Sequence, residues 1–199
     1  MTETIGKGKP YLKTENGYGE PIIEISHLKK SFGENQVLKD FNLTVHKGEN
    51  VVILGKSGCG KSVLIKCIVG LLYYDDGSLK VFGKEIGDLE QQELDELRAK
   101  IGFVFQSSAL YDSMTVRENL LFPLRRHKRK NHKHEEDIIQ EALENVGLSH
   151  AINLMPSELS GGMRKRIGLA RSLVLEPEII LHDEPTTGLD PITGKEISN

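Results

Sequence analysis

Apolar residues recur along this chain with two different periodicities, one typical of strands and one of helices, and together they predict a mixed α/β domain. Residues 22–25 begin a first strand, and residues 37–45 alternate with a period of two, which predicts a half-exposed strand. Residues 49–54 and 178–181 are rich in consecutive apolar side chains, which favours buried strands, the second of them typical of a parallel sheet. Helical patterns cover residues 63–69, 89–98, 115–147 and 160–173.

Turn, capping and terminal signals set the limits of these elements. The sequence Asp-Asp-Gly-Ser at residues 75–78 predicts a turn before a strand over residues 79–82. Ser160 is a preferred N-cap, and the two glycines that follow it keep the helix start accessible to an anion. Residues 1–20 show little periodicity and predict a flexible tail, so the folded domain is expected over residues 21–199.

Residues 55–62 match the phosphate-binding P-loop pattern G-x-x-x-x-G-K-[ST], and they lie between a predicted strand and a predicted helix, as that motif requires. The glycines would let the backbone turn its N–H groups inward, where they surround a polyphosphate together with the helix N-terminus. Lys61 would reach the β- and γ-phosphates, and the Ser62 hydroxyl would ligate Mg²⁺. The alternative is a Gly-Ser turn before a helix. The predicted nucleotide contacts are Gly55, Lys56, Ser57, Gly58, Cys59, Gly60, Lys61, Ser62 and Val63.

Further motifs flank the P-loop in a fixed order. They are Lys-Ser-Phe-Gly at 30–33, Phe-Val-Phe-Gln at 103–106, Leu-Ser-Gly-Gly-Met at 159–163, Ile-Ile-Leu-His-Asp-Glu-Pro at 179–185 and Thr-Gly-Leu-Asp-Pro at 187–191. Together with the P-loop, this ordered set closely resembles the ATP-binding-cassette (ABC) ATPases. The resemblance extends over roughly residues 22–199, which is nearly the whole sequence.

The resemblance implies a P-loop NTPase fold. The expected architecture is an α/β, RecA-like core with an antiparallel β subdomain and a helical subdomain at about residues 107–172. It also implies ATP and Mg²⁺ as cofactors, and a homodimer that hydrolyses two ATP molecules sandwiched head to tail. Ser160, Gly161 and Gly162 would then contact the nucleotide on the P-loop of the second ATPase subunit, and Asp190 would cross the interface.

The same resemblance assigns catalytic roles to individual residues. Asp183 would hold Mg²⁺ mostly through water, with Ser62 and Gln106 as further metal contacts. Glu184 would act as the general base or polarise the attacking water, although an Asp-Glu pair before Pro is also compatible with a solvated strand end. Lys61 would neutralise phosphate charge, and Gln106 would sense the γ-phosphate and Mg²⁺ and signal to the helical subdomain. The alternative for Gln106 is an ordinary surface glutamine.

Three residues and one charged run allow competing interpretations. Phe32 would stack on adenine in the family, and the competing interpretation is a core phenylalanine. Met163 stands where Gln is more usual, and His182 stands at a normally apolar position, where a packed neutral histidine is expected. Residues 125–134 are strongly basic, which predicts a solvated loop between two helices or a surface for anionic lipid or an acidic partner, rather than a metal site.

Residues 102–119 and 158–166 narrow the resemblance to the ATPases of MCE-type bacterial lipid importers, the maintenance-of-lipid-asymmetry group, in which Met163 is expected. This resemblance implies a phospholipid or another hydrophobic substrate. It implies an integral-membrane permease and an MCE-type lipid-binding protein as partners, with the ATPase held peripherally at the cytoplasmic face of the cell membrane. The alternatives are an ABC importer for small polar solutes, a soluble ABC ATPase of translation or DNA repair, and a catalytically incomplete fragment.

Composition excludes several other classes of protein. The 199 residues suffice for one domain with a substantial core, and the net charge of −3 argues against bulk binding of nucleic acid. No apolar run approaches the ~18 residues of a membrane span, and no secretory signal is visible at the first residues. Cys59 and Cys67 are expected to be reduced cytosolic thiols.

The sequence stops at Asn199, before the strand and histidine that form the H-switch of ABC ATPases. In this family that strand lies between the P-loop strand and the strand that precedes Asp183. We therefore expect an incomplete cassette, truncated before the H-switch strand, whose residues 51–54 and 178–181 lack a neighbour. Such a chain is expected to be poorly stable and nearly inactive by itself, since unpaired buried backbone groups each cost about 1–3 kcal/mol.

Overall fold

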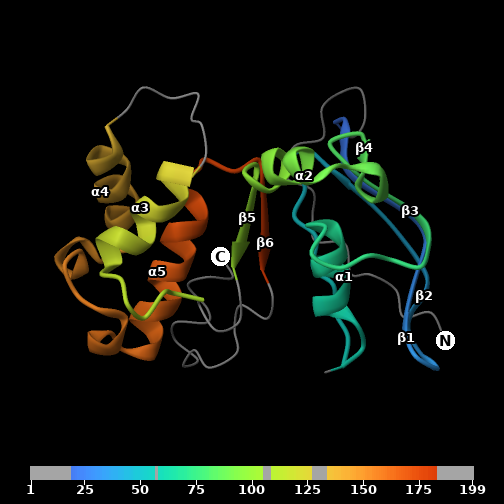
Figure 1. Cartoon of the computed structure of the whole chain (residues 1–199), viewed down its shortest axis with the longest axis horizontal. Helices are drawn as coiled ribbons and strands as arrows, with labels where there is room; N and C mark the ends of the chain where they lie inside the picture. Colours follow the sequence, from blue (N-terminus) through green and yellow to red (C-terminus); the bar gives the residue numbers. More distant parts are fainter. Residues whose placement is uncertain (1–18, 57, 105–108, 127–133, 183–199) are drawn as a thin grey trace. The chain divides into compact units, whose positions relative to one another are not determined.

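The computed structural model describes residues 19–56, 58–104, 109–126 and 134–182. They belong to two compact units that divide between Asp95 and Glu96, and each unit is described by itself (Figure 1). The first contains β1 (Pro21–Phe32), β2 (Asn35–His46), α1 (Lys61–Ile68), β3 (Asp76–Val81), β4 (Lys84–Glu85) and the 3-10 helix η1 (Ile86–Asp88), while α2 (Gln91–Arg98) spans the division. The second contains β5 (Ile101–Val104), α3 (Val116–Arg126), α4 (Glu135–Asn145), η2 (Ser149–Ala151), η3 (Pro156–Glu158), α5 (Gly161–Leu173) and β6 (Ile179–His182).

Four antiparallel strands in the order β2–β1–β3–β4 make the sheet of the first unit. The strands predicted at residues 22–25 and 37–45 are confirmed, and β1 continues to Phe32 because its far end also pairs with β2. Alternate side chains point to opposite faces of a sheet, so the period-two pattern buries one face. Its nearly inaccessible side chains include Ile23, Ile25, Leu38, Val45, Leu79 and Val81.

The turn predicted at residues 75–78 is wrong, since β3 already begins at Asp76. Gly77 lies within this strand with a φ of 98°. A Cβ atom at this position would lie 2.5 Å from the carbonyl oxygen of His27 on β1, where the pairing register is irregular. The glycine therefore allows β3 to approach the bulged part of β1 and does not reverse the chain.

The buried strand predicted over residues 49–54 is also wrong. The segment forms no strand, and the side chains of Val52 and Leu54 are 62% and 81% exposed. A strand is stabilised by hydrogen bonds to a neighbouring strand, and none of the strands in the described ranges pairs with this segment. Apolar composition alone predicted the wrong state here, because burial also requires a partner.

In the second unit, β5 and β6 pair in parallel, from Ile101 opposite Ile179 to Val104 opposite His182. The parallel strand predicted over residues 178–181 is therefore confirmed, but its continuous burial is not. Ile179 is buried, whereas the next residue, Ile180, is exposed. Successive side chains alternate between the two faces of a sheet, so Ile180 points to the face opposite Ile179 and is itself in contact with solvent.

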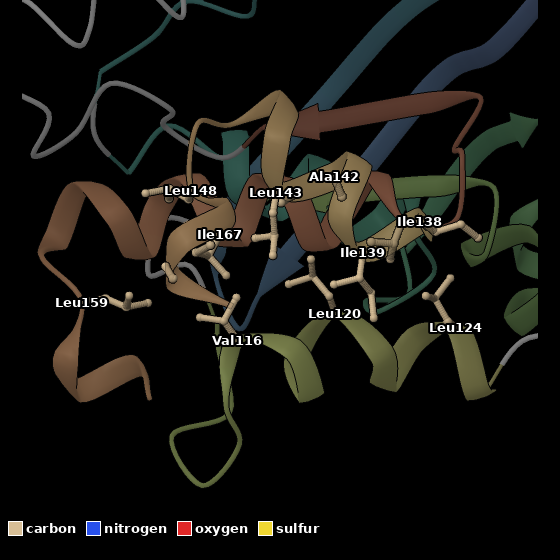
Figure 2. Packing of buried hydrophobic residues seen from close by; sticks show 13 residues of the cluster. Val116, Leu120, Leu124, Ile138, Ile139, Ala142, Leu143, Leu148, Leu159 and Ile167 are labelled. Carbon is tan, nitrogen blue, oxygen red and sulfur yellow. The ribbon is translucent and has the colours of Figure 1, made fainter. Parts of the chain in front are cut away.

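Helices α3, α4 and α5 pack around one apolar core (Figure 2). The helical patterns at residues 115–147 and 160–173 are confirmed within the described ranges, and those at residues 63–69 and 89–98 correspond to α1 and α2. Leucine and isoleucine side chains of the three helices point toward one another in Figure 2, which is what their 3.6-residue spacing dictates. Fully buried members of this core are Val116, Leu120, Ile139, Leu143, Ala151, Ile167 and Ala170.

Asn119 on α3 is a polar residue that is fully buried in this unit. Its Oδ1 accepts a hydrogen bond from the amide of Tyr111 at 2.8 Å. Its Nδ2 donates to the carbonyl oxygens of Tyr111, Met114 and Thr115 at 3.1, 3.0 and 3.0 Å. One side chain therefore holds the preceding loop against the start of α3. Two of the carbonyls that it contacts, those of Tyr111 and Thr115, also accept hydrogen bonds from the backbone amides of Met114 and Asn119.

We expect Asn119→Ala to lower the free energy of unfolding by about 1–3 kcal/mol, because it removes the hydrogen bonds to the Tyr111 amide and the Met114 carbonyl oxygen. Urea unfolding of the full chain followed by circular dichroism measures this. The matched control is Asn145→Ala, which removes an exposed amide from the last residue of α4 and should change stability little. Equal unfolding midpoints for the two variants would contradict the role assigned to Asn119.

Candidate functional site

Lys61 is the first residue of α1 and folds back over the predicted phosphate-binding loop. Its Nζ donates to the carbonyl oxygens of Gly55 at 2.8 Å and Lys56 at 3.1 Å, and it lies 3.9 Å from Sγ of Cys59. The ammonium group therefore lies among neutral backbone carbonyls of its own loop. A phosphate would displace these contacts, because hydrogen bonds between two charged groups are stronger than those to a neutral acceptor.

Gly60 connects this loop to α1 as the N-cap residue, with a φ of 102° that favours glycine. A Cβ atom here would lie 2.7 Å from Cγ1 of Val37 on β2, so the missing side chain lets the loop pack closely on the sheet. None of the described side chains caps the start of α1. A helix start without a side-chain cap favours an anionic ligand.

The structure brings most of the predicted P-loop contacts together in the first unit. Gly58 has a φ of 79°, and Ser62 and Val63 lie in the first turn of α1. Ser57 lies outside the described residues. Cys59 is exposed, whereas burial raises the pKa of the Cys67 thiol to about 11, so Cys67 stays protonated at neutral pH.

Phe32 lies at the end of β1 and is 49% exposed, which disfavours the competing interpretation of a core phenylalanine. The Nζ of Lys30 lies 5.5 Å from the centroid of the Phe32 ring, and it also forms an ion pair with Asp75. Sequence reasoning identified neither Lys30 nor Asp75 as a neighbour of the candidate site. The two residues lie 45 positions apart, and strand register, which the sequence pattern does not reveal, brings them together.

The Ser160 segment belongs to the second unit, where it begins α5 as predicted. The Ser160 hydroxyl accepts a hydrogen bond from the amide of Met163 at 3.2 Å, and this is the geometry of an N-cap. Cβ atoms added at Gly161 or Gly162 would meet nothing within 4 Å, so the helix start is open. Met163, which stands where Gln is more usual, is partly buried and packs against the helical core.

The strands β5 and β6 end side by side, since Val104 and His182 are register partners. The His182 ring is half-buried, and this burial lowers its pKa, which agrees with the neutral packed histidine expected from the sequence. Its Nδ1 has no hydrogen-bond partner among the described residues. The predicted site residues that follow these two strands, Gln106, Asp183 and Glu184, lie outside the described residues, as does Asp190.

The basic run predicted as a loop at residues 125–134 is described only at its ends. Arg125 and Arg126 close α3, and His134 precedes α4 as its N-cap residue. Residues 127–133 lie outside the described residues, so the choice between a solvated loop and a lipid or partner contact stays a prediction.

Comparison with known proteins gives a family match over most of the chain. Residues 38–187 match the family model described as ABC transporter. Among solved structures, the chain is similar to a dimeric ATP-binding cassette, MJ0796, in a post-hydrolysis state bound to ADP and Pi. The TM-score is 0.79 with 36% sequence identity, over 88% of this chain and 79% of the other. The mixed α/β fold of a P-loop NTPase is thereby confirmed.

Three curated relatives differ in the transport named for them. The chain is 46% identical over 195 residues to the probable ribonucleotide transport ATP-binding protein mkl of Mycobacterium tuberculosis, covering 98% of this chain and 54% of that protein. It is 45% identical to the methionine import protein MetN of Campylobacter jejuni, over 88% of this chain and 57% of MetN. It is 41% identical to the intermembrane phospholipid transport protein MlaF of Haemophilus influenzae, over 86% of this chain and 65% of MlaF. The chain thus spans about half the length of the first two relatives.

We expect Gly60→Ala to weaken ATP binding by about ten-fold or more, because a Cβ facing Val37 would displace the loop that carries Lys61. Isothermal titration of the full chain with Mg-ATP measures this. The matched control is Gly19→Ala, where the nearest atom to an added Cβ is 3.8 Å away and the contact is therefore ordinary. Unchanged affinity in Gly60→Ala would show that the loop tolerates displacement from β2.

Proposed function

The chain belongs to the ABC transporter family of ATP-binding proteins, and we propose that it binds and hydrolyses ATP to power transport across a bacterial envelope. One observation carries the proposal: the Lys61 ammonium lies within the carbonyls of a glycine loop, at the start of a helix without a described side-chain cap. That arrangement presents a cation and backbone donors to a polyphosphate. The similar cassette that binds ADP and Pi supports an adenine nucleotide as the ligand.

Hydrolysis would also require oxygen ligands for magnesium. Ser62 in the first turn of α1 follows Lys61 directly, and a hydroxyl is the kind of hard oxygen donor that Mg²⁺ accepts. Asp183 and Gln106 are the other proposed ligands. Bound Mg²⁺ would neutralise phosphate charge, while Glu184 is proposed to orient and deprotonate the attacking water.

The proposed active unit is a homodimer. Ser160, Gly161 and Gly162 lie at an open helix start in the second unit, and helix starts favour anions. In the proposed dimer these residues contact the nucleotide held by the P-loop of the partner copy, and Asp190 lies near the interface. The dimeric state of the similar cassette supports this assembly.

A transport ATPase would need a membrane partner. Within the described ranges, none of the helices is both long enough and apolar enough to cross a membrane. The loop held by Asn119 presents Tyr111, which is 42% exposed, next to the partly exposed Leu110 and Met114. We propose that these residues dock a permease, which would hold the chain peripherally at the cytoplasmic face of the membrane.

The proposed substrate is a phospholipid, and an MCE-type lipid-binding protein is the proposed further partner. The likeness to MlaF supports this, as do residues 102–119 and 158–166, which resemble lipid-importer ATPases. The second candidate is a solute importer, which the likeness to MetN favours.

Two variants test the proposed ATPase. Lys61→Ala should weaken Mg-ATP binding by about 10–100-fold, since it removes a charge-assisted phosphate contact. In a longer form of the protein that continues through the expected H-switch strand, Glu184→Gln should keep ATP binding but stop turnover and trap the dimer, because water activation is lost while ground-state contacts survive. Isothermal titration, a phosphate-release assay and light scattering measure these effects. Lys66→Ala, on the exposed face of the same helix, is the control. Turnover at the wild-type rate in Glu184→Gln would remove Glu184 from the mechanism.

The substrate and partner assignments make a separate prediction. The chain, purified in detergent with its permease, should retain phospholipid that mass spectrometry identifies, and phospholipid should raise its ATPase rate. Leu110→Glu should weaken the association with the permease, because a charge enters an apolar contact, and it should leave ATP binding unchanged. His150→Glu places the same charge at an exposed position and is the control. An ATPase rate that rises with methionine and not with lipid would favour the solute importer.

A further inference from the structure

Two ion pairs fasten the end of β1 that carries Phe32. The Nζ of Lys29 lies 2.7 Å from Oδ2 of Asp76, and the Nζ of Lys30 lies 2.7 Å from Oδ1 of Asp75. The two pairs differ in their surroundings. The Lys29 side chain is about half exposed, whereas only 13% of the Lys30 side chain is accessible. The second pair is therefore shielded from solvent more strongly, and shielded pairs hold their geometry better than exposed ones.

Asp75 contacts each of the three residues that precede Phe32. Its own amide donates to the carbonyl oxygen of Lys29 at 2.8 Å. Its Oδ1 accepts from the Lys30 ammonium, and its Oδ2 accepts from the amide of Ser31 at 2.6 Å. The Lys30 and Ser31 hydrogen bonds lower the pKa of the Asp75 carboxyl, which therefore stays ionised at neutral pH. One residue in the segment after α1 thus fixes the backbone leading to Phe32.

The Lys30 ammonium also lies 5.5 Å from the centroid of the Phe32 ring, where a cation is attracted to the π-electrons. Half of the Phe32 surface remains exposed, so the ring can still receive a flat ligand. A cation at one face withdraws electron density from the ring. An electron-rich purine would then stack more favourably on the exposed part of the ring. Without Asp75, Lys30 would lose the partner that keeps its ammonium at the ring.

We propose that Asp75, acting through Lys30, is a positioning residue that sets how strongly Phe32 binds the purine base of the nucleotide. This inference rests on the proposed function, because it requires Phe32 to be the surface on which the base stacks. It makes a specific distinction between parts of the ligand. Asp75 and Lys30 contribute to binding of the base, whereas the loop that contains Lys61 contributes to binding of the phosphates.

The experiment compares Mg-ATP with magnesium tripolyphosphate, which has no base, by isothermal titration of the full chain. Asp75→Asn keeps the shape of the side chain and removes its charge. It should weaken ATP binding by about three- to ten-fold and leave tripolyphosphate binding unchanged. Phe32→Ala should show the same ligand dependence. The double variant should bind ATP no more weakly than Phe32→Ala alone, because Asp75 acts only through that ring.

The neighbouring ion pair provides a matched control. Asp76→Asn removes the Lys29 pair from the same strand end, and the carboxylate of Asp76 contacts Lys29 and the Gly77 amide among the described residues. It should leave the affinity for ATP unchanged. Lys30→Met keeps most of the side-chain length and removes the ammonium. Its loss of ATP affinity should equal that of Asp75→Asn, even if Asp75→Asn melts at a lower temperature.

Different outcomes would overturn the inference and the proposed function. Equal losses for ATP and tripolyphosphate in Asp75→Asn, or the same ATP loss in Asp76→Asn, would show that Asp75 supports only the fold and would overturn the inference alone. Failure of the wild-type chain to bind either ligand would overturn the proposed function, and the inference with it. Full ATP affinity in Phe32→Ala would overturn the inference while leaving the P-loop assignment intact.

Discussion

Both units depend on one constraint. At certain positions a neighbouring element comes so close to the backbone that only glycine, which has no Cβ atom, can occupy them. In the first unit, a Cβ at Gly60 would lie 2.7 Å from a β2 side chain, and one at Gly77 would lie 2.5 Å from the carbonyl of His27. In the second, a Cβ at Gly102 on β5 would lie 2.8 Å from the carbonyl of Ser172. Since real Cβ atoms do not approach other atoms this closely, these glycines set the distance between neighbouring elements. The P-loop, the middle of β1 and the start of β5 each lie beside one of these glycines.

Local sequence patterns predicted the helices and several strands, and they failed at residues 49–54 and 75–78, where the outcome depends on a neighbouring segment. The helix starting after Ser160 was predictable from its cap and spacing, and the structure has both. The apolar run at residues 49–54 was not, because a strand forms only against a neighbour. Gly77 resembled a turn residue, although its role is to admit β1, which lies about 50 positions earlier in the chain. Sequence periodicity reports which face is apolar and contains no information about which segment will cover it.

In the candidate site as well, the sequence identified the candidate ligand-binding residues but not the residues proposed to position them. Motif spacing identified Lys61 and Ser160 as candidate site residues, and the structure describes each in a geometry that suits an anion. Lys30 belongs to the Lys-Ser-Phe-Gly motif and Asp75 to the predicted turn at residues 75–78, but neither pattern pointed to their contact, because that contact depends on the pairing of β1 with β3. Residues that bind a ligand directly are constrained in sequence by chemistry. Residues that position them are constrained by geometry, which becomes visible only in the folded chain.

An exposed aromatic ring in each unit lies beside a cation that is itself held in place. Lys30 lies 5.5 Å from the Phe32 ring, and the guanidinium of Arg171 lies 5.2 Å from the Tyr111 ring while donating a hydrogen bond to the carbonyl of Ala109 at 2.7 Å. Since about half of each ring is exposed, burying the rest would contribute about 1 kcal/mol, roughly half of what full burial contributes. A ring already held in one orientation loses little further entropy when a partner arrives, so binding retains more of the contact energy. If the proposed roles hold, with Phe32 receiving a purine and Tyr111 a permease, the same physical device prepares both rings: a cation that is itself held by other contacts fixes the ring before the ligand arrives.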